Sequence, residues 1–65
     1  MTTALRPRIL VVDDDLALLE ALVQALESMG YEALGESDPL LGLSHIGSWD
    51  PDVAIFDLKM PGMDG

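Results

Sequence analysis

Four aspartates in this sequence stand where they could do chemistry together. Asp13, Asp14 and Asp15 follow one apolar segment directly, and Asp57 follows another at residues 53–56. A carboxylate can act as a covalent nucleophile, and carboxylate oxygens are ligands that Mg²⁺ prefers. Two such charges ~4 Å apart repel by about 1 kcal/mol in water and about 4 kcal/mol near a protein surface, so a cation would have to offset them. This pattern predicts an open metal site with room for a phosphoryl group.

The aspartate run also has a simpler interpretation as the start of a helix. One aspartate can cap a helix N-terminus, and Asp15 is the best placed of the three. The run alone therefore leaves capping and metal binding open. Asp57 is harder to explain structurally, because it follows four apolar residues and precedes the turn-forming residues 60–62.

Five patterned segments position these aspartates. Residues 8–12 and 53–56 are unbroken apolar runs typical of strands buried on both faces, whereas residues 31–36 alternate like an edge strand. A helix follows each of the first two strands. The apolar positions at helical spacing are Leu16, Leu19, Leu22, Val23, Leu26 and Met29 in the first helix, and Leu40, Leu41, Leu43 and Ile46 in the second.

Glycine and proline mark the ends of these segments. Gly30 is placed to end the first helix in a left-handed conformation, and Asp38 with Pro39 is placed to begin the second. We expect Gly42 and Gly47 to weaken that second helix.

The single histidine and the single tryptophan call for structural roles. His45 lies on the second predicted helix without another nitrogen or sulfur ligand nearby in the sequence, so we expect a surface or half-buried position. Trp49 falls in a predicted turn at residues 48–52, where it should pack at the end of the sheet away from the aspartates.

The order strand, helix, strand, helix, strand predicts an α/β fold with parallel strands and right-handed crossovers. Two buried strands and one edge-like strand fit the spatial order 2-1-3, which begins the doubly wound order 2-1-3-4-5 of flavodoxin-like proteins. Ligands in such sheets bind at the carboxyl ends of the strands beside the switch point. Asp13, Asp14 and Asp57 are expected to meet there.

Composition limits the possible functions. The 65 residues make at most one domain, residues 1–65, and 49% hydrophobic content argues against disorder. A net charge of −9 disfavours binding to nucleic acid or anionic membranes and favours a cation or a basic partner. The absence of cysteine suits a cytoplasmic chain, and no apolar stretch is long enough to span a membrane.

Residues 9–15 (ILVVDDD) and 52–65 (DVAIFDLKMPGMDG) resemble the two early signature segments of response-regulator receiver domains in bacterial two-component systems. The resemblance implies that Asp57 accepts a phosphoryl group from a phosphohistidine on a sensor histidine kinase. It also implies that Asp13, Asp14, Asp57 and the backbone carbonyl of Lys59 bind Mg²⁺. It further implies that the acyl phosphate is later hydrolysed by water in the same site, and that the domain is a switch more than an enzyme.

The same resemblance predicts a receiver truncated after its third strand. The family also uses a Ser or Thr after strand four and a Lys after strand five, so we expect that residues 1–65 cannot switch alone and that the missing part of a longer parent is one partner. An uncovered edge on strand three would then favour self-association. Two alternatives stay open: a self-associating structural fragment without phosphotransfer, and a haloacid-dehalogenase-like phosphohydrolase fragment with Asp13 as its nucleophile.

Overall fold

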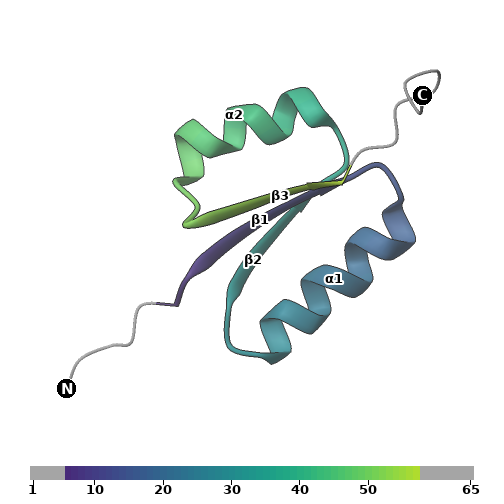
Figure 1. Ribbon diagram of the computed structural model, residues 1–65, viewed down its shortest axis with the longest axis vertical. Helices are drawn as coiled ribbons and strands as arrows, with labels where there is room; N and C mark the ends of the chain where they lie inside the picture. Colours follow the sequence, from purple (N-terminus) through teal and green to yellow (C-terminus); the bar gives the residue numbers. More distant parts are fainter. Residues whose placement is uncertain (1–5, 58–65) are drawn as a thin grey trace.

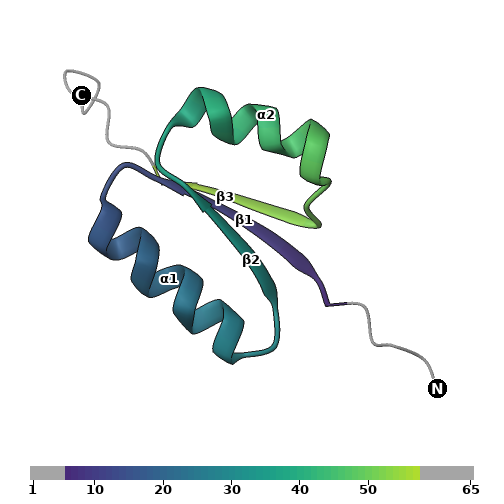
Figure 2. The ribbon, with the colours of Figure 1, turned by 180° about the vertical axis from the view of Figure 1, so that it is seen from behind.

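The fold is a three-stranded parallel sheet with a helix on each face (Figures 1 and 2). The computed structural model describes residues 6–57. The elements are β1 (Arg8–Asp13), α1 (Leu16–Ser28), β2 (Glu32–Glu36), α2 (Pro39–Trp49) and β3 (Val53–Asp57). The strands lie in the order β2-β1-β3, and β1 pairs in parallel with both neighbours. The predicted α/β class, strand order and edge position of β2 are confirmed.

The core forms around the central strand. Leu10, Val11 and Val12 are completely buried. Because side chains alternate along a strand, Val11 packs toward α1 and joins Leu19, while Val12 faces α2. A helix therefore covers each face of β1, which explains its unbroken apolar sequence.

The apolar stripe of α1 was predicted correctly in its middle and wrongly at its ends. Leu19 is buried, and Leu22, Val23 and Leu26 pack against the same cluster. Leu16 and Met29 are exposed instead, because they lie at the first turn and at the C-terminal cap, beyond the contact with the sheet.

Both predicted caps of α1 are confirmed. The Asp15 side chain accepts a hydrogen bond from the Leu18 N–H at 3.2 Å. At the other end Gly30 has φ +97°, and its N–H donates to the carbonyl of Glu27 at 3.0 Å. The helix therefore ends at a residue in the left-handed conformation, which glycine adopts without strain.

The predicted contact face of α2 is wrong. All four apolar residues assigned to it are exposed, and the buried position is Gly42. A Cβ built on Gly42 would lie 2.6 Å from Cγ2 of Val12, so the helix can come this close to β1 only where it has no side chain. The large aliphatic residues of α2 are all at least 41% exposed. The predicted start is confirmed, since Asp38 caps the helix and Pro39 follows.

The second helix also extends further than predicted. It includes Ser48 and Trp49, which were assigned to a turn at residues 48–52. Trp49 is the last residue of α2, and Asp50 follows in the left-handed region at φ 56°. The Arg8 guanidinium donates to the Trp49 carbonyl at 2.7 Å and lies 5.4 Å from the centre of its ring. Arg8, the first residue of β1, thus supplies the hydrogen bond for the Trp49 carbonyl. Trp49 therefore lies at the end of the sheet away from the aspartates, as predicted.

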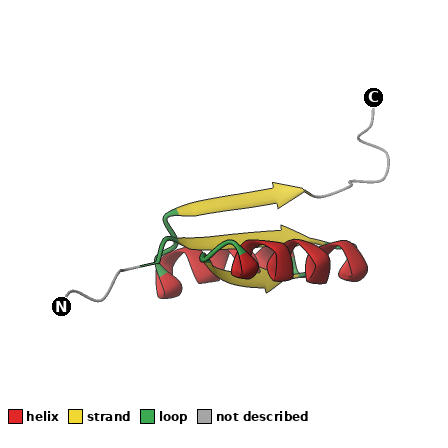
Figure 3. Ribbon diagram, turned by 90° about the horizontal axis from the view of Figure 1, so that it is seen from below, coloured by secondary structure: helices red, strands yellow, loops and turns green. Residues whose placement is uncertain are grey.

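The prediction that β3 is buried on both faces is wrong for residues 6–57. Val53, Ile55 and Phe56 are 50%, 42% and 38% exposed. The reason is its position at the outside of the sheet, because α1 and α2 pack against β1 and β2 and leave β3 uncovered (Figure 3).

Within residues 6–57 no helix has the length and apolar character needed to cross a bilayer.

Candidate functional site

The carboxyl ends of β1 and β3 bring two of the predicted site residues side by side. Asp13 and Asp57 are register partners in the parallel ladder, each being the last residue of its strand. They lie far apart in sequence, and only the pairing of the two strands places them together. The expectation that these two aspartates meet at this edge of the sheet is confirmed.

A hydrogen-bonded clamp at the opposite end of the strands sets this register. The Arg8 N–H donates to Oδ2 of Asp52 at 2.8 Å, and the Asp52 N–H donates to the carbonyl of Arg8 at 2.8 Å. A shift of one residue would reverse the facing of the β3 side chains and separate the aspartates. The clamp therefore positions Asp13 and Asp57 without touching them.

Asp13 is a buried carboxylate with one unused oxygen. Asp13 is 2% exposed, and its Oδ1 accepts a hydrogen bond from the Asp15 N–H at 2.9 Å. Its Oδ2 is buried and has no hydrogen-bond partner among the described residues. An unsatisfied buried carboxylate oxygen is costly, so it suits a position where a cation or an ordered water supplies the missing contact.

The other two members of the aspartate run, Asp14 and Asp15, differ in their surroundings. Asp15 caps α1, as predicted, which leaves its carboxylate engaged with the helix. Asp14 is exposed at the start of the loop between β1 and α1, within one residue of the paired strand ends. It is thus a solvent-exposed carboxylate that follows Asp13 directly in the chain.

These carboxylates do not form a ready-made metal cluster. Within residues 6–57, no three acidic or histidine side chains are gathered closely enough to hold a metal ion by themselves. The fourth predicted ligand, the backbone carbonyl of Lys59, lies outside the described residues, as does the predicted loop at residues 58–65. What the described residues offer is one unsatisfied oxygen and exposed carboxylates next to it, and Mg²⁺ commonly takes one or two carboxylates together with waters and phosphate oxygens.

Asp57 differs from Asp13 in its access to solvent. It is exposed at the end of β3, whereas its register partner is buried. The two aspartates are therefore neighbours in the ladder that differ in their access to solvent.

A polar cluster that the sequence reasoning missed lies at the end of β2. Glu36 accepts a hydrogen bond from the Asp38 N–H through Oε2, and its Oε1 lies 3.0 Å from Nε2 of His45. The Asp38 N–H first, and His45 second, lower the pKa of Glu36. His45 is half-buried as predicted, and the cluster ties α2 to the sheet. Only a combined placement of β2 and α2 on one face could have revealed the contact.

The fold and site define a class: a doubly wound α/β protein with an acidic site at the carboxyl ends of its first and third strands. The family model of the response regulator receiver domain matches residues 9–65. The chain belongs to this family, and its strand order is that of the beginning of a flavodoxin-like receiver fold.

Relatives with similar sequences carry the same kind of segment. The chain is 39% identical over 61 residues to the DNA-binding response regulator MtrA of Mycobacterium tuberculosis, covering 94% of this chain and 27% of MtrA. It is 43% identical over 58 residues to the response regulator MprA of Mycobacterium avium, covering 89% and 25%. It is 42% identical over 59 residues to protein-glutamate methylesterase/protein-glutamine glutaminase 1 of Anaeromyxobacter dehalogenans, covering 91% and 17%.

These relatives are much longer than the present sequence. The chain spans about a quarter of the length of MtrA and MprA and less of the methylesterase. No solved structure is a significant match. The comparisons therefore establish the family of this segment.

Proposed function

We propose that Asp57 accepts a phosphoryl group from a phosphohistidine on a sensor histidine kinase, and that residues 1–65 are part of a receiver domain. The observation that carries the proposal is the pairing of an exposed Asp57 with a buried Asp13 whose Oδ2 is unsatisfied. One group supplies an accessible nucleophile and the other a place for a cation. The family match gives this pairing its chemical meaning.

The transfer is a substitution at phosphorus. A carboxylate oxygen of Asp57 forms a bond to phosphorus as the bond from phosphorus to the donor imidazole nitrogen breaks, and that nitrogen takes up a proton. Catalysis of this reaction rests on positioning and on neutralising the charge of the phosphoryl oxygens. The β1–β3 ladder holds the nucleophile at the strand end, and the acyl phosphate is later hydrolysed by water. The domain is thus a switch, and the same proposal places it in the cytoplasm with its kinase.

The residues present fit Mg²⁺ as the cation. Asp13, Asp14 and Asp57 are the carboxylates that would hold it, together with the backbone carbonyl of Lys59 on sequence grounds. Bound Mg²⁺ would offset the repulsion among the carboxylates and the incoming phosphoryl oxygens. The unsatisfied Oδ2 of Asp13 supports this assignment.

The haloacid-dehalogenase alternative is not favoured. It requires Asp13 to attack the substrate, yet Asp13 is buried and its Oδ1 is engaged by the Asp15 N–H. The family match also favours the receiver over this phosphohydrolase.

A small phosphodonor tests the proposal directly. The protein is treated with acetyl phosphate and Mg²⁺, and the modified residue is located by mass spectrometry after borohydride trapping. Modification of Asp57 is the expected result. Label on Asp13, or label that persists in Asp57→Asn, contradicts the proposal.

We also propose that the outer edge of β3 pairs with another strand, in this 65-residue chain that of a second copy. The supporting observation is the exposure of apolar side chains along β3, the strand that neither helix covers. Strand edges with unpaired N–H and C=O groups are templates for such pairing. Self-association would accompany phosphoryl transfer and does not replace it.

A further inference from the structure

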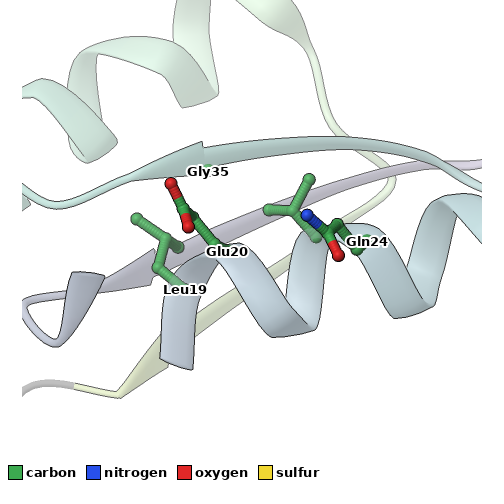
Figure 4. A pocket seen from close by; sticks show the side chains of 5 residues that line it. Leu19, Glu20, Gln24 and Gly35 are labelled. Carbon is green, nitrogen blue, oxygen red and sulfur yellow. The ribbon is translucent and has the colours of Figure 1, made fainter. Parts of the chain in front are cut away.

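A shallow hollow lies between α1 and the outer strand β2, away from the paired aspartates. It has a volume of about 320 Å³ and is lined by Leu19, Glu20, Val23, Gln24 and Gly35. Figure 4 shows the Glu20 side chain extending from α1 with its carboxylate toward β2, and Gln24 beside it further along the helix. The hollow therefore has an apolar floor and a polar rim that carries one carboxylate.

The edge strand leaves this hollow accessible from the side. Gly35 faces α1, since a Cβ there would lie 2.8 Å from Cγ2 of Val23, and strand alternation puts Ala33 on the same face. On this face of β2 the side chains of Gly35 and Ala33 are only a hydrogen and a methyl group, and Leu19 and Val23 of α1 fill the space directly over Gly35. In the described sheet the outer edge of β2 carries no further strand, and β2 also stays outermost in the doubly wound order 2-1-3-4-5.

The charges around the hollow are all of one sign. Neither α1 nor β2 contains a basic residue, and the acidic ones are Glu20, Glu27, Glu32 and Glu36. Within residues 6–57, Glu32 pairs with Arg8 and Glu36 contacts His45, whereas Glu20 takes part in neither salt bridge. A second copy of this acidic chain would be repelled here, and a basic partner would be attracted.

We propose that this hollow binds a basic side chain, arginine or lysine, of an extended partner segment that adds as a strand to the edge of β2. Strand addition places every second side chain of the partner on the α1 face, beside Ala33 and Gly35. The aliphatic stem of such a side chain lies over Leu19 and Val23, and its charged end reaches the Glu20 carboxylate. The site is independent of phosphoryl transfer at Asp57, because it lies along a different edge of the sheet.

A peptide titration tests this site. The ¹⁵N-labelled protein is titrated with acetyl-Val-Thr-Arg-Thr-Val-amide and, separately, with the same peptide carrying uncharged citrulline in place of arginine. We expect the arginine peptide to shift the amide signals of residues 19–24 and 33–35 and to slow hydrogen exchange in β2. The citrulline peptide is expected to bind more weakly.

Two matched variants locate the charge that matters. Glu20→Gln should weaken binding of the arginine peptide by about twofold to fivefold, the range of a partly exposed charge pair. Glu27→Gln removes the same charge from the same helix outside the hollow and should bind as the unmodified protein does. Equal losses in both variants, equal binding of both peptides, or shifts that spread over all acidic residues would overturn the proposal.

Discussion

Asp13 and Asp57 are direct neighbours in the β1–β3 ladder, but one is 2% exposed and the other stands in solvent. Their difference follows from where their strands lie. The central strand β1 is covered by a helix on each face, whereas β3 is the outer strand. The proposed function rests on this arrangement. Asp57 is the nucleophile on the exposed strand β3, and Asp13, whose Oδ2 lacks a hydrogen-bond partner, lies beside it on the covered strand β1.

Asp57→Asn should abolish labelling by acetyl phosphate, because the amide of asparagine is not a competent nucleophile toward phosphorus. Intact-mass measurement after incubation with Mg²⁺ checks this. Asp50→Asn is the matched control, since Asp50 lies at the other end of the sheet and asparagine tolerates its left-handed φ of 56°. Labelling of the control should be unchanged.

Asp13→Asn should lower the affinity for Mg²⁺ by roughly tenfold or more, because it removes charge from the unsatisfied Oδ2 while keeping an acceptor for the Asp15 N–H. Isothermal calorimetry measures the change. Asp15→Asn keeps a good helix cap and should leave Mg²⁺ affinity as it is. Chelation of Mg²⁺ with EDTA should also suppress labelling of Asp57. An equal loss of affinity in Asp15→Asn would argue against Asp13 as a specific ligand.

Two glycine substitutions in one helix should change stability in opposite directions. Gly42→Ala places a methyl 2.6 Å from Cγ2 of Val12 and should destabilise the fold by about 1–3 kcal/mol, despite the better helix propensity of alanine. Gly47→Ala meets nothing within 4 Å and should stabilise by about 0.5–1 kcal/mol. Urea unfolding measures both, and a stabilised Gly42→Ala would show that α2 does not rest on β1 as described.

Stability should depend on the ionisation of Glu36 in acid. Its pKa lies below the ordinary value of 4.5, first because the Asp38 N–H donates to the carboxylate and then because of His45. A lowered folded-state pKa means that the stabilisation is complete above pH 4.5 and is lost as the pH falls through the lower folded-state value.

The comparison with Glu36→Gln tests this dependence. The unmodified protein should be the more stable of the two at neutral pH, and its advantage should shrink as the pH falls from neutral to below the ordinary glutamate value of 4.5 and Glu36 is protonated. Urea midpoints at several pH values measure the difference. Glu27→Gln serves as the control for removing one exposed carboxylate. A constant advantage across this range would show that the Glu36 contacts do not stabilise the folded state.

Ile55→Lys should reduce self-association of the 65-residue chain, because a charge on an exposed strand blocks pairing with another edge. Sedimentation velocity at several concentrations measures the oligomer. Since the net charge is −9, association should strengthen as salt screens the repulsion. Leu16→Lys, at an exposed position on α1, is the control. A compact monomer of the unmodified chain at all concentrations would contradict the proposed pairing of β3.

Local patterns were sufficient where neighbours in the sequence decide the structure. The caps at Asp15 and Asp38, the left-handed Gly30 and the middle of the α1 stripe depend on residues within a turn of one another. The edge position of β2 and the central position of β1 also followed, because edge-like alternation and an unbroken apolar run reflect how many faces each of these strands has covered. The unbroken run of β3 did not indicate its position at the outside of the sheet.

The sequence by itself thus determined the family, the fold class and the identity of the paired aspartates. Only the tertiary structure decided that Gly42, and not the leucines of α2, meets the sheet, that β3 is uncovered, and that Glu36 contacts His45. The physical reason is that these features depend on how closely a helix approaches a strand and on which strand it covers. Such distances arise from packing between elements, and no periodicity within one element encodes them.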